Sequence, residues 1–181
     1  MQTGHELFVH GLNDIRDAEH RLVEALQELE NDSTNQQLKS AFAHHRKETQ
    51  HQIERLSQCF ELMGESPEET ECAGIRGIIE EKKTFMEEDP TDDILDVFHI
   101  EAASKAEAYE ITEYQSLVQM AREMKHLKVA QLLNQTLKEE LATLKKMQAF
   151  SKKIKPEEMM TEEQQARVKD LAGRKRTRRA A

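Results

Sequence analysis

Tryptophan is absent from this chain of 181 residues, and glycine, proline and cysteine occur only 6, 3 and 2 times. Alternation of apolar and polar residues, the pattern of a half-buried strand, is hard to find anywhere. The chain is instead rich in alanine, leucine, glutamate, lysine and glutamine, which favour helices. The composition therefore predicts an all-α protein.

The two cysteines, Cys59 and Cys72, lack the close spacing of a metal-binding pair and form no evident disulfide framework. We expect each to be a small buried side chain or a free thiol. No run approaches the roughly 18 consecutive apolar residues of a membrane span. The N-terminus also lacks the basic region and apolar stretch of a signal peptide. These absences predict a cytoplasmic protein with no membrane partner.

Charge is abundant but unevenly placed. Charged residues make up 34% of the chain and the formal net charge is −9. Residues 152–181 hold 10 of the 26 basic groups and 5 of the 35 acids, so the rest of the chain carries about −14. The sequence thus predicts an acidic body and a basic tail. The length suits one domain that buries about two thirds of its unfolded surface, so a metal is not needed for folding.

Apolar residues recur at helical spacing in four long segments, which predicts four amphipathic helices. Residues 31–33 separate the first two, residues 64–67 end the second, and residues 89–92 precede the third. The four apolar stripes are Phe8, Leu12, Ile15, Leu22, Leu26 and Leu29; Leu38, Phe42, Ile53, Leu56, Phe60 and Met63; Leu95, Ala102, Ala106, Leu117, Ala121 and Met124; and Leu133, Leu137, Leu144 and Met147.

The links between these helices predict the topology. Short links join the first helix to the second and the third to the fourth, whereas about 28 residues separate the second from the third. A link of that length can run the length of a bundle, as in ferritin-like four-helix bundles with one long crossover. We expect a small amphipathic helix at residues 72–87 within it. The predicted organisation is a bundle over residues 1–155, a C-terminal helix over 156–173, and a disordered basic tail over 174–181.

Four glutamates lie on or near the apolar side of their helices. At about 100° per residue, Glu19, Glu110 and Glu140 fall close to the centres of their stripes, and Glu107 lies about 60° from the centre. Glu19, Glu110 and Glu140, together with Glu48 of the second helix, each lie near the middle of their helix, so these four should meet in one layer. Carboxylates in a water-poor core raise one another's pKa and need compensation, which a pair of divalent cations provides.

The second helix adds Glu48 at the edge of its stripe, about 80° from the centre, with His45 and Gln52 well inside. His45 is a candidate ligand, or equally a hydrogen-bonded core residue. Although Glu48 and His51 form the Glu-x-x-His string of di-iron helices, His51 points about 140° away and is better explained as a surface residue. Taken alone, Glu48 or Glu107 is better explained as a boundary acid paired with lysine or arginine, but the coincidence over four helices favours a metal site.

Oxygen ligands with one imidazole suit iron or manganese. Tyr109 and Tyr114 flank the acid pair on the third helix and are expected either to pack in the core or to supply a hydrogen bond or a redox-active phenol. The predicted cofactor is therefore two iron ions, or manganese, and the candidate ligands are Glu19, Glu48, Glu107, Glu110, Glu140 and His45.

Three segments in order resemble the YciF/YciE group of ferritin-like bacterial stress proteins: Leu12 to Glu19, His45 to Gln52, and Glu107 to Ile111. The similarity continues to Glu140 and covers roughly residues 5–150. It implies a rubrerythrin-like bundle, a homodimer and a di-metal centre with the ligand candidates named above. Two positions depart: Thr143 stands where rubrerythrin-like proteins have histidine, and Leu144 where YciF relatives have an acid.

These features leave three functional hypotheses open. The first is a di-iron protein of the stress response that reduces oxygen or peroxide. The second is a metal-binding protein without turnover. The third is nucleic-acid contact through the basic cluster at residues 174–179, for which a solvated tail is the simpler explanation. The sequence does not identify a catalytic residue.

Overall fold

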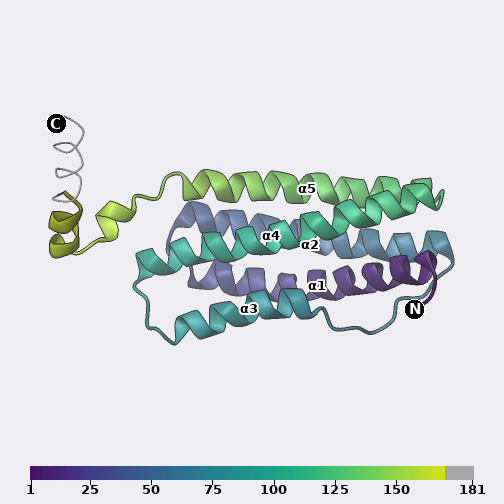
Figure 1. Cartoon of the computed structure of the whole chain (residues 1–181), viewed down its shortest axis with the longest axis horizontal. Coiled ribbons are helices and arrows are strands. Elements are labelled where there is room, and N and C mark those ends of the chain that lie inside the picture. The colour runs from purple at the N-terminus through teal and green to yellow at the C-terminus, as the bar shows by residue number, and fades with distance from the viewer. Residues whose placement is uncertain (170–181) are drawn as a thin grey trace, which may run out of the picture. The chain divides into compact units, whose positions relative to one another are not determined.

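The computed structural model describes residues 1–169, which are helical without any strand (Figure 1). Residues 1–151 form one compact unit. Its long helices are α1 (Gly4–Asp32), α2 (Gln36–Met63), α4 (Asp92–Glu123) and α5 (Leu127–Ser151), and the shorter α3 (Ala73–Met86) lies in the connection between α2 and α4. This is the predicted ferritin-like four-helix bundle with one long crossover and a short crossover helix.

The helix boundaries follow local capping chemistry. Thr3 and Glu6 form a reciprocal capping box at the start of α1. The Asn35 side chain accepts hydrogen bonds from the backbone of Gln37 and Leu38 at the start of α2. Gly64 ends α2 in the left-handed region with φ of +71°, which a glycine adopts without strain. These caps stand at the breaks that the sequence predicts.

The link between α1 and α2 is held by a side chain from α4. Asp96 accepts hydrogen bonds from the backbone N–H groups of Thr34 and Asn35, both at 2.9 Å, and from the Thr34 hydroxyl at 2.8 Å. This turn is thereby fixed against the start of α4. Because the intervening residues 64–91 travel the length of the bundle, α2 and α4 run in the same direction (Figure 1).

The core lies between the four long helices and extends under α3. It contains the apolar stripes predicted from the sequence, with Phe8, Leu12, Ile15, Phe60, Tyr114 and Leu117 among its fully buried side chains. Cys59 and Cys72 are both buried and free, as predicted. The crossover helix is attached through Cys72 and Ile75, which join this core. Hydrophobic burial therefore holds α3 on the bundle at the level of α1 and α4.

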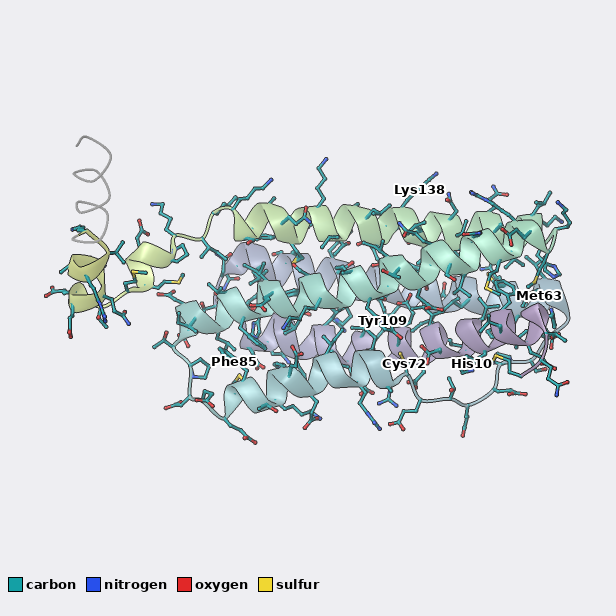
Figure 2. All side chains as sticks on the ribbon, viewed as in Figure 1. His10, Met63, Cys72, Phe85, Tyr109 and Lys138 are labelled. Atoms are coloured by element: carbon teal, nitrogen blue, oxygen red, sulfur yellow. The ribbon has the colours of Figure 1, made fainter. Side chains whose placement is uncertain are left out.

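Tyr109 of α4 lies against the first turn of α3, where Figure 2 labels it beside Cys72. Its hydroxyl donates to Asp14 at 3.1 Å and lies 3.2 Å from the Cys72 sulfur. The ring leaves no room at Gly74, because a Cβ atom there would stand 2.4 Å from Tyr109 Cε2. Gly74 is therefore required for the close approach of the two helices.

The two glycines of α3 give a matched prediction. We expect Gly74→Ala to lower the free energy of unfolding by about 1–3 kcal/mol, because the new methyl group overpacks the contact with Tyr109. Gly77→Ala should instead raise it by up to about 1 kcal/mol, because nothing lies within 4 Å of that position and alanine is the better helix former. Urea unfolding of both variants measures the difference. Equal effects of the two substitutions would contradict this packing.

Residues 152–169 begin a second unit. It contains a 3₁₀ turn at η1 (Pro156–Met159), and α-helix resumes at residue 162. The predicted C-terminal helix from about residue 157 is thus interrupted at Met160 and Thr161. Thr161 and Gln164 exchange hydrogen bonds between side chain and backbone, which is a capping box that starts a new helix. Residues 170–181, which include the predicted end of the C-terminal helix and the basic tail at 174–181, lie outside the described residues.

Candidate metal centre

Four buried side chains from three helices meet in the middle of the bundle: His45 of α2, Glu107 and Glu110 of α4, and Glu140 of α5. Each offers one ligand atom, and these atoms all lie within 4.8 Å of one another. None of the four side chains is more than 4% exposed. We call this group the ligand cluster.

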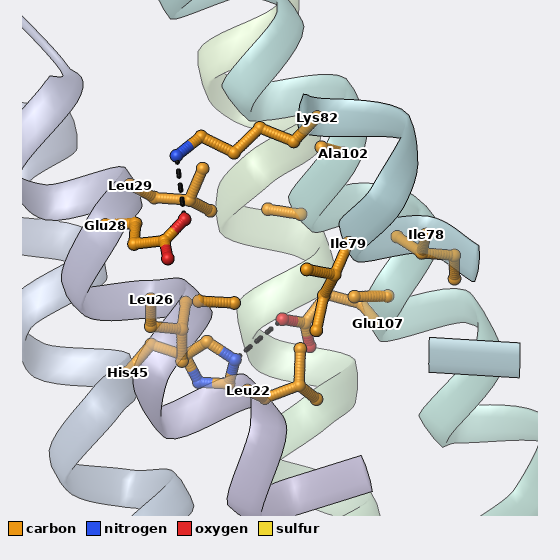
Figure 3. A pocket seen from close by; sticks show the side chains of 13 residues that line it. Leu22, Leu26, Glu28, Leu29, His45, Ile78, Ile79, Lys82, Ala102 and Glu107 are labelled. Carbon is orange, nitrogen blue, oxygen red and sulfur yellow. Dashed lines mark hydrogen bonds and ion pairs between the residues drawn. The ribbon is translucent and has the colours of Figure 1, made fainter. Parts of the chain in front are cut away.

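One ion pair lies inside the ligand cluster. His45 Nε2 is 2.8 Å from a carboxylate oxygen of Glu107 (Figure 3), and both side chains are almost wholly buried. The other ring nitrogen of His45, Nδ1, is buried without a hydrogen-bond partner among the described residues. His45 is therefore a polar group of the cluster with donor or acceptor capacity left over.

Glu19 of α1 lies next to the ligand cluster and outside its four members. It is fully buried, and the Tyr114 hydroxyl donates a hydrogen bond to its Oε1 atom. Burial raises the pKa of Glu19 well above its ordinary value, and the charge of nearby Glu140 raises it further. Carboxylates from three helices and an imidazole from the fourth thus face one region of the core.

The hydrogen-bonding capacity of this region is far from satisfied. In the described part of the chain, Oε2 of each of the four buried glutamates has no partner, and neither has Oε1 of Gln52. Buried polar atoms are nearly always paired in native proteins, because an unpaired one costs about 1–3 kcal/mol. A concentration of buried, unpaired oxygens in one place is a donor set that a cation could satisfy.

All three carboxyl groups of the ligand cluster have raised pKa values. Burial raises the pKa of Glu107 to about 8. Burial likewise raises the pKa values of Glu110 and Glu140 well above normal, and the charges of neighbouring carboxylates add to both shifts. These three acids and the neighbouring Glu19, all with raised pKa values, would release protons on taking up a cation.

A second group of side chains supports Glu140. Gln52 Nε2 donates to Glu140 Oε1 and, at 3.2 Å, to Glu139. Arg55 donates from both terminal nitrogens to the Glu139 carboxylate, at 2.9 and 3.0 Å, and also to the Thr136 hydroxyl. This bidentate arrangement orients Glu139, and through Gln52 it holds the Glu140 carboxylate in place.

Arg55→Ala should therefore act on stability and on the centre together. We expect the free energy of unfolding to fall by about 1–3 kcal/mol, because Glu139 and Thr136 lose a largely buried partner. Metal affinity should fall as well, since Gln52 is then less firmly placed against Glu140. Lys105→Ala, which removes more exposed ion pairs with Glu81 and Glu101, is the control and should cost less than about 1 kcal/mol. Urea unfolding and metal titration of both variants test this.

Three other polar residues that the sequence singles out are not members of the ligand cluster. Glu48 is part-exposed, and its carboxylate lies 3.5 Å from His44. Its negative charge contributes to the raised pKa of Glu107. His51 is exposed, as predicted, and lies 3.3 Å from Glu54. Thr143, at the position of the rubrerythrin-type histidine, is buried. Glu48 therefore borders the cluster, and His51 is separate from it.

Sequence reasoning missed the support from Arg55, Thr136 and Glu139. These residues lie on the edges of their helices, where a helical wheel cannot distinguish a surface charge from a partly buried one. The sequence did contain a signal. Gln52 and Arg55 lie one turn apart on α2, and the residues that they contact, Thr136 and Glu139, lie one turn apart on α5. Recognising it requires knowing that α2 and α5 are neighbours, which the sequence predicts only through the topology.

An all-α bundle with one long crossover and acids gathered from its helices into the core is a ferritin-like four-helix protein. The pattern of the DUF892 family, described as a domain of unknown function, matches residues 3–172, and the chain belongs to this family.

The chain is 37% identical over 144 residues to protein YciF of Escherichia coli strain K12, covering 79% of this chain and 87% of YciF. The crystal structure of that protein, named a stress protein, is similar with a TM-score of 0.80 at 36% identity, covering 83% of this chain and 96% of the other. YcfI of Rhodopseudomonas palustris gives a TM-score of 0.79 at 35% identity, covering 82% and 94%. A Xanthomonas campestris protein at 19% identity, with a TM-score of 0.67 over 83% and 92% of the two chains, shares the fold.

Within residues 1–169, every helix is too short or too polar to cross a lipid bilayer.

Proposed function

We propose that this protein binds two iron or manganese ions in the core of its bundle and uses them to reduce oxygen or peroxide. The observation that carries the proposal is the group of unpaired, buried ligand oxygens on Glu19, Glu107, Glu110 and Glu140. A core that keeps four carboxylates close together without enough hydrogen-bond donors is costly unless cations neutralise them.

The residues present fit such ions. His45, Glu107, Glu110 and Glu140 supply one imidazole and three carboxylates, the hard ligands that suit iron and manganese. Glu19, beside Glu140, and Glu48, beside Glu107, are the further carboxylates within electrostatic reach of the cluster. Two divalent ions would balance the four buried carboxylates.

When bound, the ions would supply the one-electron couples needed to reduce an oxidant. The chain itself holds and protects this region. Tyr114 and Gln52 hold Glu19 and Glu140 by hydrogen bonds, and the bundle excludes bulk water from all four buried acids. The four carboxylates store the protons that metal binding displaces.

The relative from Escherichia coli that is called a stress protein suggests the setting. We propose the same setting for this chain, as a homodimer that protects the cell from an oxidant. Light scattering during gel filtration tests the dimer, and a mass of about 21 kDa, that of one chain, would exclude it.

One observation favours metal binding without turnover as the second candidate. Thr143 is buried at the position where rubrerythrin-like proteins have histidine, so the centre has a single imidazole in its ligand cluster. A second ion held by fewer ligands would be bound more weakly, and a centre filled by one ion has no partner for a two-metal reaction.

The deciding experiment is a metal analysis of protein purified without chelators, followed by anaerobic titration with ferrous and manganous ions. Two ions per chain and oxidation of bound ferrous iron by oxygen or peroxide would support the proposal. Ions that bind but are not turned over would select the metal-binding alternative. A protein that binds neither ion would contradict the proposal.

A further inference from the structure

A small cavity of about 40 Å³ lies between α1, α3 and α4, and its lining includes His45 and Glu107 of the ligand cluster (Figure 3). Its walls come mainly from apolar side chains of these three helices. They include Leu22, Leu26 and Leu29 of α1, Ile79 of α3, and Ala102 and Ala103 of α4. The short alanine side chains of α4 leave space that leucine would fill.

The polar groups of this cavity lie toward its two ends (Figure 3). At one end His45 and Glu107 pair with each other at 2.8 Å. At the other, the Lys82 ammonium donates to Glu28 at 3.0 Å and to Asp32 at 2.7 Å, and both of these carboxylates are exposed to solvent. The lining of the cavity therefore includes Lys82 and Glu28 near the solvent side of the α1–α3 contact and His45 and Glu107 in the centre of the bundle, with apolar side chains between these two pairs.

The lining decides what can occupy this cavity. A cavity of this size has room for a few atoms. Between its polar ends the walls are leucine, isoleucine and alanine, which offer a water molecule no hydrogen bonds, so this middle stretch favours an apolar occupant. Hydrogen peroxide carries two O–H donors and would lose its hydrogen bonds with water on entering. Dioxygen has no such bonds to lose.

We propose that this cavity admits dioxygen, rather than hydrogen peroxide, to His45 and Glu107. The inference rests on the proposed function, since it names the oxidant of the same centre. The proposal gives α3 a role beyond packing. This crossover helix supplies one wall of the path, and its Lys82 side chain closes the outer end. Hydrogen peroxide would have to reach the centre by another route.

Xenon, an apolar probe that needs no metal, tests the cavity directly by ¹²⁹Xe nuclear magnetic resonance of the metal-free protein. We expect saturable xenon binding in the wild type and its loss in Ala103→Leu. Ala121→Leu makes the same change at a buried alanine of α4 that does not line the cavity, and it should keep xenon binding. Absence of xenon binding in the wild type, or its survival in Ala103→Leu, would overturn the inference.

A second readout separates this inference from the proposed function. With ferrous iron bound, Ala103→Leu should slow oxidation by dioxygen severalfold and leave oxidation by hydrogen peroxide nearly unchanged, relative to Ala121→Leu at equal iron content. Equal slowing by both oxidants, or no slowing, would contradict the proposed path. Failure of the wild type to bind iron, despite xenon binding, would instead reject the proposed function.

Discussion

Replacing Glu110 and Glu140 together by glutamine is expected to give a folded protein that no longer binds ferrous or manganous ions and is more stable without metal than the wild type. Both carboxylates are buried, and burial raises their pKa values. The charge of Glu140 adds to the shift of Glu110, and the charge of Glu107 adds to the shift of Glu140. Glutamine keeps the size and removes the ionisable group, so the cost of burying like charges disappears. We expect a gain of about 1–4 kcal/mol in the metal-free state.

Thermal unfolding with a chelator and with added manganous ion measures both effects. The wild type should be less stable than the double variant with chelator, and metal should raise the stability of the wild type alone. Replacing Glu101 and Glu123 by glutamine makes the same change in charge at exposed positions of α4 and should alter neither result. A double variant that binds metal normally would remove Glu110 and Glu140 from the proposed ligands.

The stability of the metal-free protein should fall as pH rises from about 6.5 to 8.5. The pKa of Glu107 is raised by burial to about 8, and those of Glu19, Glu110 and Glu140 are also raised. A carboxyl group with a raised pKa in the folded state holds a proton that the unfolded chain has already lost. Its contribution to stability therefore decreases as pH approaches the folded pKa, by about 2 kcal/mol for Glu107 over this range.

The starting pH is chosen because His99 acts in the opposite direction below it. Burial lowers the pKa of His99 to about 4, so its contribution to stability grows as pH rises from there to about 6.5. Urea unfolding at pH 6.5 and 8.5 with a chelator measures the change. The buried thiols of Cys59 and Cys72, whose pKa values burial also raises, act in the same direction near pH 8.5, so the comparison with Glu107→Gln assigns the share of Glu107. Glu107→Gln should flatten part of the slope, and added manganous ion should reverse it, because metal binding is favoured by deprotonation. Equal stability of the wild type at both pH values would contradict the raised pKa values.

The arrangement of the helices was predictable because link length and helical period point to the same topology. The inward direction of Glu19, Glu110 and Glu140 followed from their places within leucine-rich stripes, and all three are buried. Their role as ligands stays a prediction. The helical wheel placed Glu48 at the boundary of its apolar stripe, and the structure leaves this residue part-exposed. A 3.6-residue period alone was therefore enough to separate core from boundary here.

Contacts between helices were beyond the reach of that reasoning. The fit of Tyr109 against Gly74 and the hold of Arg55 on Glu139 depend on the axial register of two helices, which no single-helix pattern contains. The break before residue 162 was readable in principle, since Thr161 and Gln164 have the spacing of a capping box. It was missed because Pro156 offered an earlier and equally good helix start.

The order in which the helices appear along the chain has a consequence for biosynthesis. Glu19 and His45 emerge early from the ribosome, Glu107 and Glu110 follow, and Glu140 comes on α5, the last helix of the bundle. Domains fold as units during synthesis, so a nascent chain that ends before α5 exposes an incomplete set of acids. On the proposed function, loading with iron or manganese would then be a late event of maturation, after the bundle has left the ribosome, when the availability of metals in the cell decides which ion is taken.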